Sequence, residues 1–185
     1  MAIRSSLLKH SAHQNKAITI CTDASFDNDL KIGSWACYIR TDDKIFKHGE
    51  VIKTSIENST EAERIGVANA LWMANKMVDL KEYRIVMYCD NESAMKPPRP
   101  GNKTGRKRQR AKLQQEFFNK NIHKYLQMAL TYDVRHVKGH MDRTARHRMQ
   151  ARHHIQDWCD KKAKELLIER RSILKKKLEE PLELS

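Results

Sequence analysis

The stretch Ala17-Ile18-Thr19-Ile20-Cys21-Thr22-Asp23 combines apolar and β-branched residues and finishes on a carboxylate. It predicts a core strand over residues 17–23. A charged side chain at the edge of a core needs a partner or a metal ion. Three later acids have comparable places in the sequence, after an apolar strand or on a helix: Asp90, Glu63 and Asp160. Four carboxylates at such positions favour a cation site.

The composition limits the partners of the chain. At 185 residues it is most economically one domain with room for a core. Its 36 lysines and arginines exceed its 23 acids, which gives a net charge of +13. This surplus attracts polyanions, of which nucleic acid is the commonest. No run of apolar residues is long enough to span a membrane, so we expect no membrane partner, and a monomer is the default.

The four cysteines lie far apart, and three of them fall inside strand-like runs. They are typical of small buried thiols in a reducing compartment, and this favours a cytoplasmic location. A disulfide framework or a zinc knuckle is not expected.

Three segments divide the chain. Residues 1–16 contain basic residues and no acid, which predicts a flexible basic arm; organelle targeting is the weaker interpretation. Residues 17–180 are expected to form the single domain, with a basic insertion at 96–112. Residues 181–185 form a tail.

Two further strands should follow the first. The runs 32–40 and 44–52 are rich in β-forming residues, and turn residues at 26–29 and 41–43 separate the three strands. Such short connections predict an antiparallel meander.

After residue 57 the spacing of the apolar residues changes to that of a helix. This predicts a helix of about 20 residues, capped at 58–60. One buried face is formed by residues at helical spacing: Val67, Leu71, Ala74 and Val78. Glu63 lies at the head of this face, and Glu61 should point away from it. The spacing from Thr60 to Glu63 also fits a capping box, as does that from Asn58 to Glu61, so this pattern alone leaves the role of Glu63 open.

The nearly apolar run 83–89 predicts a central strand, and Asp90 follows it. A strand–helix–strand unit that returns to one sheet makes parallel neighbours, so Asp23 and Asp90 should meet at the carboxyl ends of their strands. A helix N-cap is the alternative role for Asp90, and the expected pairing with Asp23 favours a site.

Two segments carry unbalanced positive charge. No acid occurs between Glu92 and Glu116, and a helix is expected from about Arg106 through Leu130. The first segment predicts a phosphate-contacting protrusion, formed by Lys96, Arg99, Lys103, Arg106, Lys107, Arg108, Arg110 and Lys112. The second segment, 143–154, is a possible second basic element and contains Arg143, Arg146 and Arg148. Its histidines do not predict zinc, because neighbouring arginines oppose a cation.

A fifth strand is expected over 132–137, and the loop after it carries His140, for which a plain surface position is the alternative. The last helix should run to about Glu180 and stop at Pro181. One of its faces contains Asp160, Ala163, Leu167, Leu174 and Leu178. Asp157, one turn before Asp160, is the rival carboxylate.

The order strand–strand–strand–helix–strand–helix–strand–helix, with acids at these places, resembles ribonuclease H and most of all its type 1 members. The matching motifs are Thr22-Asp23-Ala24-Ser25, Thr60-Glu61-Ala62-Glu63, Tyr88-Cys89-Asp90-Asn91, Val137-Lys138-Gly139-His140 and Trp158-Cys159-Asp160-Lys161-Lys162-Ala163. The resemblance spans about residues 17–170. It implies an α/β fold with a five-stranded mixed sheet, antiparallel over strands 1–3 and parallel over strands 1, 4 and 5, flanked by helices.

The resemblance also implies a site and an activity. Asp23, Glu63, Asp90 and Asp160 would bind two Mg²⁺ ions, with Mn²⁺ as a substitute, and His140 would assist proton transfer or product departure. Carboxylates suit these hard cations, which would promote hydrolysis of a phosphodiester. The expected activity is endonucleolytic cleavage of the RNA strand of an RNA–DNA hybrid, with RNA recognised by its 2′-OH.

Some features depart from that family. Asp-Ala-Ser stands where Asp-Gly-Ser is usual, and the stretch from His140 to Asp160 is longer than the usual loop. The pair Asp157 and Asp160 is also similar to the paired acids of junction resolvases, so a structure-specific DNA nuclease is the alternative enzyme. A catalytically inactive nucleic-acid-binding module is the alternative that is not an enzyme; the presence of all four acids argues against it.

Overall fold

The computed structural model describes residues 16–98, 101, 104–137 and 151–179. Five strands form one sheet in the order β3-β2-β1-β4-β5. The strands are β1 (Ala17–Asp27), β2 (Ile32–Arg40), β3 (Ile45–Val51), β4 (Arg84–Cys89) and β5 (Thr131–His136). The helices are α2 (Ser59–Met77), the short 3₁₀ turn η1 (Leu80–Glu82), α3 (Gly105–Phe118), η2 (Asn119–His123), α4 (Lys124–Met128) and α5 (Ala151–Glu179).

The first three strands form the predicted antiparallel meander, but β1 is longer than expected. It continues four residues beyond Asp23 and pairs with β2 as far as Asp27, which faces Ile32. The turn therefore begins after Asp27 and not at Phe26. The prediction failed because the polar residues that resemble a turn are held in the ladder by the neighbouring strand.

Strands β1, β4 and β5 are parallel, as predicted. The ladder between β1 and β4 ends at the pair Cys21 and Tyr88, although β1 itself continues. Asp23 and Asp90 each lie two residues beyond this pair. The acids therefore occur where β4 leaves β1, and this point fixes the position of the site.

Helix α2 packs its apolar face on β1 and β2. Val67, Leu71 and Ala74 are fully buried in this interface, which confirms the predicted face except at Val78, which follows the end of the helix and is half-buried. Gly66 allows the close approach, since a Cβ there would lie 3.0 Å from Thr22 Oγ1 and 3.2 Å from Trp35 Cβ. Both neighbours are themselves buried in the sheet.

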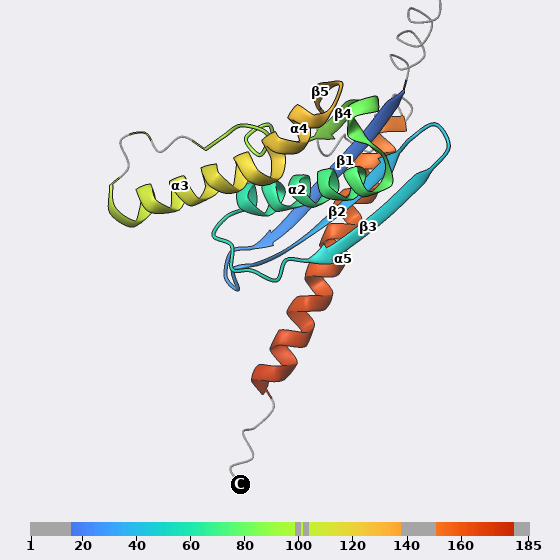
Figure 1. The fold of residues 1–185 in the computed structure, drawn as a ribbon. Helices are drawn as coiled ribbons and strands as arrows, with labels where there is room; N and C mark the ends of the chain where they lie inside the picture. Colours follow the sequence, from blue (N-terminus) through green and yellow to red (C-terminus); the bar gives the residue numbers. More distant parts are fainter. Residues whose placement is uncertain (1–15, 99–100, 102–103, 138–150, 180–185) are drawn as a thin grey trace, which may run out of the picture.

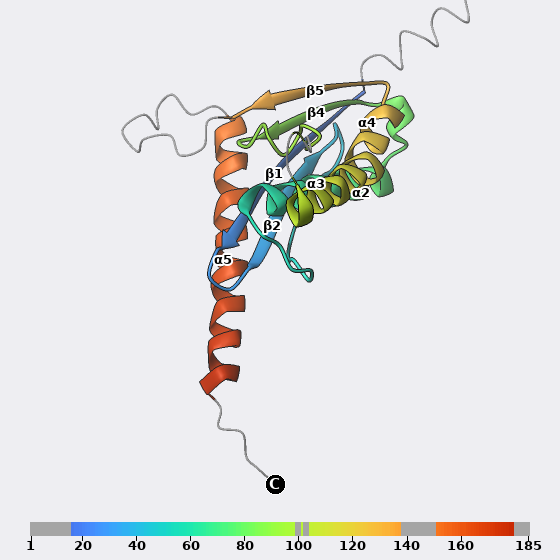
Figure 2. The ribbon, with the colours of Figure 1, turned by 90° about the vertical axis from the view of Figure 1, so that its left-hand side faces the viewer.

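A second helical segment, α3–η2–α4, lies beside α2 on the same side of the sheet (Figures 1 and 2). It begins one residue before the predicted start, contains a π turn at η2, and ends at Met128. The predicted end at Leu130 was wrong. The Leu130 N–H bonds the Tyr83 carbonyl at 3.1 Å, and this contact leads the chain into β5.

Helix α5 covers the opposite face of the sheet (Figure 2). Its buried residues Cys159 and Ala163 pack with Cys21, Ala36 and Tyr38. The expected continuation of this face was correct only in part, because Leu167 and Leu174 are half-buried. The helix runs past the edge of the sheet, so its later turns have less to pack against (Figure 1).

All four cysteines are buried and free, as expected. Within the described ranges, no helix is both long and apolar enough to cross a membrane. Residues 1–15 of the predicted arm and the tail at 181–185 lie outside the described residues, whereas Lys16, the last residue of the predicted arm, pairs with Glu82 at 2.7 Å.

Candidate metal centre

Three carboxylates predicted to act together meet in the structure. Asp23 comes from β1, Glu63 from the first turns of α2, and Asp90 from the residue after β4. One oxygen from each lies within 4.8 Å of the others. Asp23 and Glu63 are only 5% and 6% exposed. Elements distant in the sequence therefore bring three acids to one point at the edge of the core.

The backbone explains how two of these side chains are held. The Ala24 N–H donates to Asp23 Oδ1 at 2.8 Å and faces Glu63 Oε1 at 3.3 Å. The helix cap is formed by another pair, because the Asn58 side chain accepts a hydrogen bond from the Glu61 N–H. Glu63 is thus not a capping residue, which resolves the alternatives that the sequence left open.

Burial and mutual repulsion alter the protonation of this cluster. Desolvation, followed by the charges of Asp90 and Asp160, raises the pKa of Asp23 to about 7. Desolvation and the charge of Asp23 raise the pKa of Glu63 well above its ordinary value. The acids therefore resist full ionisation at neutral pH until a positive charge joins them.

The donor set suits a hard divalent cation. Its three members offer carboxylate oxygens, which are the ligands that Mg²⁺ and Mn²⁺ prefer. Cys89, the residue before Asp90, is an alternative donor, but desolvation and the charge of Glu63 raise its pKa to about 12. Its thiol stays protonated and does not compete as a soft ligand.

Asp160 and Asp157 differ in their surroundings. The Asp160 side chain is 20% exposed, and its charge contributes to the raised pKa of Asp23. It pairs with Lys164 at 2.7 Å, and it is not among the three acids within 4.8 Å. The Asp157 side chain is 47% exposed and pairs with Lys161. Asp160 therefore lies near enough to Asp23 for its charge to act there, and it is less exposed than Asp157.

Two groups of the predicted site residues lie outside the described residues. These are His140 with Arg143, Arg146 and Arg148, and, in the first basic segment, Arg99 and Lys103. Their roles stay predictions.

The described members of the first basic segment have different environments. Arg106, Lys107, Arg108 and Lys112 are exposed on α3. Lys96 pairs with Glu92 at 2.9 Å. Arg110 donates two hydrogen bonds to the buried Glu61 carboxylate, at 2.8 Å and 2.6 Å. It therefore joins α3 to the start of α2, a structural role that the spacing of charges does not reveal.

Sequence reasoning missed two residues beside the acids. A His136 ring nitrogen lies 3.0 Å from the Asp90 carbonyl oxygen. Arg64 of α2 donates to the Ser93 carbonyl at 3.1 Å, which holds the loop after Asp90. The position of His136 at the end of β5 was a usable signal, because parallel strands end at the same edge.

No family model matches the chain, and no curated protein matches it in sequence. Solved structures do match. RNase H1 from the archaeon Halobacterium salinarum is 15% identical over 83% of this chain and 98% of its own, with a TM-score of 0.53. The N-terminal RNase H domain of a Mycobacterium tuberculosis protein is 11% identical over 86% and 99%, with a TM-score of 0.55.

A third match is to part of the prototype foamy virus protease-reverse transcriptase. It is 16% identical over 82% of this chain and 21% of that one, with a TM-score of 0.52. These likenesses and the strand order β3-β2-β1-β4-β5 show that the chain has the ribonuclease H fold. The predicted fold class is confirmed.

Proposed function

We propose that this protein is a metal-dependent endonuclease that hydrolyses the RNA strand of RNA–DNA hybrids. The observation that carries the proposal is the meeting of Asp23, Glu63 and Asp90 within 4.8 Å where β4 leaves β1. In open α/β sheets, binding sites lie at the carboxyl ends of the strands. Asp160 joins these acids from α5 as the fourth member of the site.

Divalent cations, expected as two Mg²⁺, would supply neutralisation of the negative charge that develops during phosphodiester hydrolysis. The carboxylates of Asp23, Glu63 and Asp90 would hold these ions. The Ala24 N–H fixes the orientation of two of these carboxylates, Asp23 and Glu63, before any substrate binds. Asp23 and Glu63, whose pKa values are raised without metal, would ionise and serve as ligands at neutral pH when a cation is bound beside them.

The charge distribution supports a nucleic-acid substrate. The chain carries a net charge of +13, and the exposed side of α3 presents Arg106, Lys107, Arg108 and Lys112. These side chains would contact phosphates, which position a duplex without reading its sequence. Discrimination for the RNA strand would come from its 2′-OH groups.

The environment of Asp157 counts against a resolvase. That enzyme class would need a second acid of the last helix in the site, whereas the Asp157 side chain is 47% exposed, against 20% for Asp160. An inactive module would have no reason to retain two buried carboxylates beside a third that is half-buried, because each buried one carries the cost of desolvation.

The experiment is a comparison of labelled substrates with Mg²⁺ and with chelator. An RNA–DNA hybrid is assayed beside an RNA duplex, a DNA duplex and a four-way DNA junction. We expect Mg²⁺-dependent cleavage of the RNA strand in the hybrid alone. Cleavage of the junction without action on the hybrid would keep the fold and overturn the proposed activity.

A further inference from the structure

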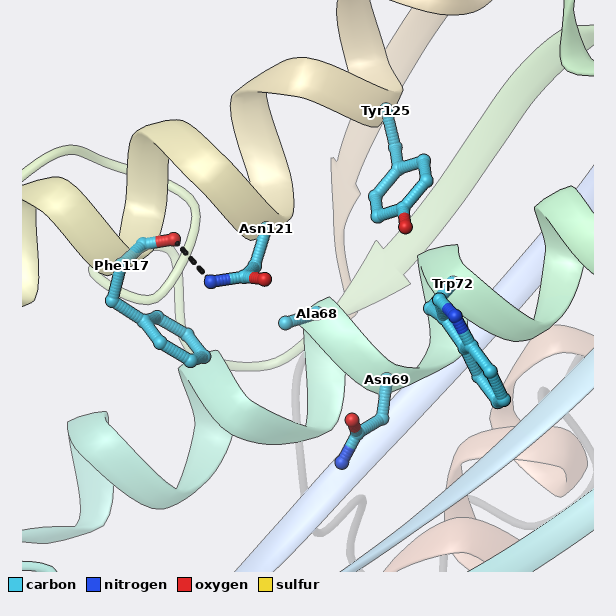
Figure 3. A pocket seen from close by; sticks show the side chains of 6 residues that line it. All are labelled: Ala68, Asn69, Trp72, Phe117, Asn121 and Tyr125. Atoms are coloured by element: carbon cyan, nitrogen blue, oxygen red, sulfur yellow. Dashed lines mark hydrogen bonds between the residues drawn. The ribbon is translucent and has the colours of Figure 1, made fainter.

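A pocket of about 290 Å³ lies between α2 and the segment α3–η2–α4. It is lined by Ala68, Asn69 and Trp72 of α2 and by Phe117, Asn121 and Tyr125 of the other segment (Figure 3). The volume is close to the lower end of the range for ligand pockets, roughly 300–1,000 Å³. It suits one small planar group better than an extended chain.

The lining combines aromatic rings with amides. Phe117, Trp72 and Tyr125 provide ring surfaces, and Trp72 is 46% exposed although it is a large aromatic residue. Asn69 and Asn121 add carboxamides, which can donate to and accept from a heterocycle. The Asn121 amide nitrogen donates to the Phe117 carbonyl at 3.0 Å, which fixes that side chain (Figure 3).

Positive charge surrounds the pocket. Lys76 Nζ lies 5.6 Å from the centre of the Trp72 ring, and Lys124 Nζ lies 5.6 Å from that of Tyr125. The two lining segments, residues 65–78 and 105–128, contain a single acid, Glu116. The surroundings of the rings therefore favour an anionic ligand with a planar aromatic part.

The π turn η2 shapes this pocket. In an uninterrupted α-helix, residue 124 would share the face of Phe117, and Tyr125 would lie about 80° away. The wider turn at Asn119–His123 accommodates one extra residue, which moves Tyr125 into the place of residue 124. Single π turns of this kind occur frequently at functional sites.

The pocket is separate from the metal centre. Trp72 follows Glu63 by nine residues, which is about 180° around the helix axis and about 14 Å along it. Because Glu63 faces the sheet and the acids, Trp72 faces away from them. A ligand here would not occupy the site of hydrolysis.

We propose that this pocket binds one unstacked base of a single-stranded nucleic acid. The base stacks on Trp72 and Tyr125, its polar edge meets the amides of Asn69 and Asn121, and the flanking phosphates lie near Lys76 and Lys124. Aromatic platforms beside basic groups are the usual means of binding single strands without sequence preference. The proposal goes beyond hybrid cleavage and does not depend on it.

The test measures the binding of a labelled oligothymidylate by fluorescence anisotropy, with chelator present. Its length of about eight nucleotides is within the site size of a single binding module. Trp72→Ala should weaken binding about fivefold or more, since each stacked base contributes at that level. Trp72→Phe, which keeps a ring, should retain most of the affinity. Ile168→Ala, a matched change at an exposed apolar residue of α5, should bind as the wild type does.

Two further arms identify what is recognised. An abasic strand with the same phosphates should bind the wild type as weakly as the normal strand binds Trp72→Ala. The chain has three tryptophans, so the signal of Trp72 is the quenching that the wild type shows and Trp72→Phe lacks. We expect the oligonucleotide alone to cause it, and equal quenching by adenosine and uridine monophosphates would overturn the strand site in favour of a nucleotide site.

Equal binding of the wild type and a folded Trp72→Ala variant would overturn the proposal, as would equal binding of abasic and normal strands. Because chelator prevents metal-dependent cleavage, these results are independent of whether the hybrid is a substrate.

Discussion

Asp23 Oδ1 and Glu63 Oε1 share one backbone N–H, that of Ala24, at distances of 2.8 Å and 3.3 Å. One partial positive charge thus faces two buried carboxylates that also repel each other. Both pKa values are raised as a result of burial and of neighbouring acids. The folded protein without metal therefore binds protons that its unfolded chain releases, and this has a measurable consequence.

Metal-free protein should become less stable as pH rises. The pKa of Asp23 is about 7 when folded against an ordinary 3.8, so the folded state binds more protons between these values. The free energy of unfolding then falls across that window, by roughly 1–3 kcal/mol, and stays low above it. Urea unfolding with chelator at about pH 5 and about pH 8 measures the difference.

Two controls assign this loss to the acid cluster. Asp23→Asn should flatten the pH dependence, because the group no longer titrates. Mg²⁺ added at the higher pH should restore stability to the wild type, since it binds the folded state. An unchanged pH dependence in Asp23→Asn would contradict the assignment.

Asp160 and Asp157 should differ sharply in their contribution to hybrid cleavage. Each pairs with a lysine four residues later, but the charge of Asp160 raises the pKa of Asp23 and its side chain is 20% exposed, whereas that of Asp157 is 47% exposed. Asp160→Asn should reduce the rate about a hundredfold or more, as the loss of one electrostatic group in an active site commonly does. Asp157→Asn should change the rate less than about threefold, because substitution of an exposed residue usually has a small effect. An equal loss of rate in both variants would contradict this and would favour the resolvase alternative.

Arg110 should contribute to stability. Its guanidinium is the partner of Glu61, whose side chain is 4% exposed. Arg110→Ala leaves this buried carboxylate with fewer donors and should lower the free energy of unfolding by about 1–3 kcal/mol. Arg108→Ala, an exposed control on the same helix, should change it by less than about 0.5 kcal/mol. Urea unfolding distinguishes the two, and equal effects would mean that the ion pair does not hold the helices together.

The exposed basic residues of α3 should determine how hybrid binding depends on salt. Replacing Arg106, Lys107 and Arg108 by Gln should reduce the slope of log K against log salt by about one for each lost phosphate contact. Lys53→Gln, an exposed change after β3, should leave the slope unchanged. Binding is measured with chelator over a range of salt, and an unaltered slope in the triple variant would place the nucleic acid elsewhere.

Sequence patterns predicted the sheet well because the local signals agreed with the packing. The run 32–40 matches β2, and α2 begins with the cap expected around Asn58. The parallel return after α2 was sufficient to place Asp23 and Asp90 at one edge. Both residues could thus be paired from strand order alone.

What failed depended on contacts between distant residues. Pairing with β2 extends β1 beyond Asp23, and no local pattern indicates this. The bond from Arg110 to Glu61 is likewise not indicated by the local pattern, and the predicted phosphate contact of Arg110 stays a prediction. The π turn at η2 leaves no signature in the sequence, so the alignment of Phe117 with Tyr125 was not predictable.

The most direct test of the central claim is the rate at which the wild type and Asp23→Asn cleave a labelled RNA strand in a hybrid, with Mg²⁺ present. The account predicts cleavage by the wild type that chelator abolishes, and a rate at least about a hundredfold lower in the variant, because a buried ligand of the metal centre is lost. Circular dichroism confirms that the variant is folded. Cleavage by Asp23→Asn at the wild-type rate, with the same dependence on Mg²⁺, would contradict the account.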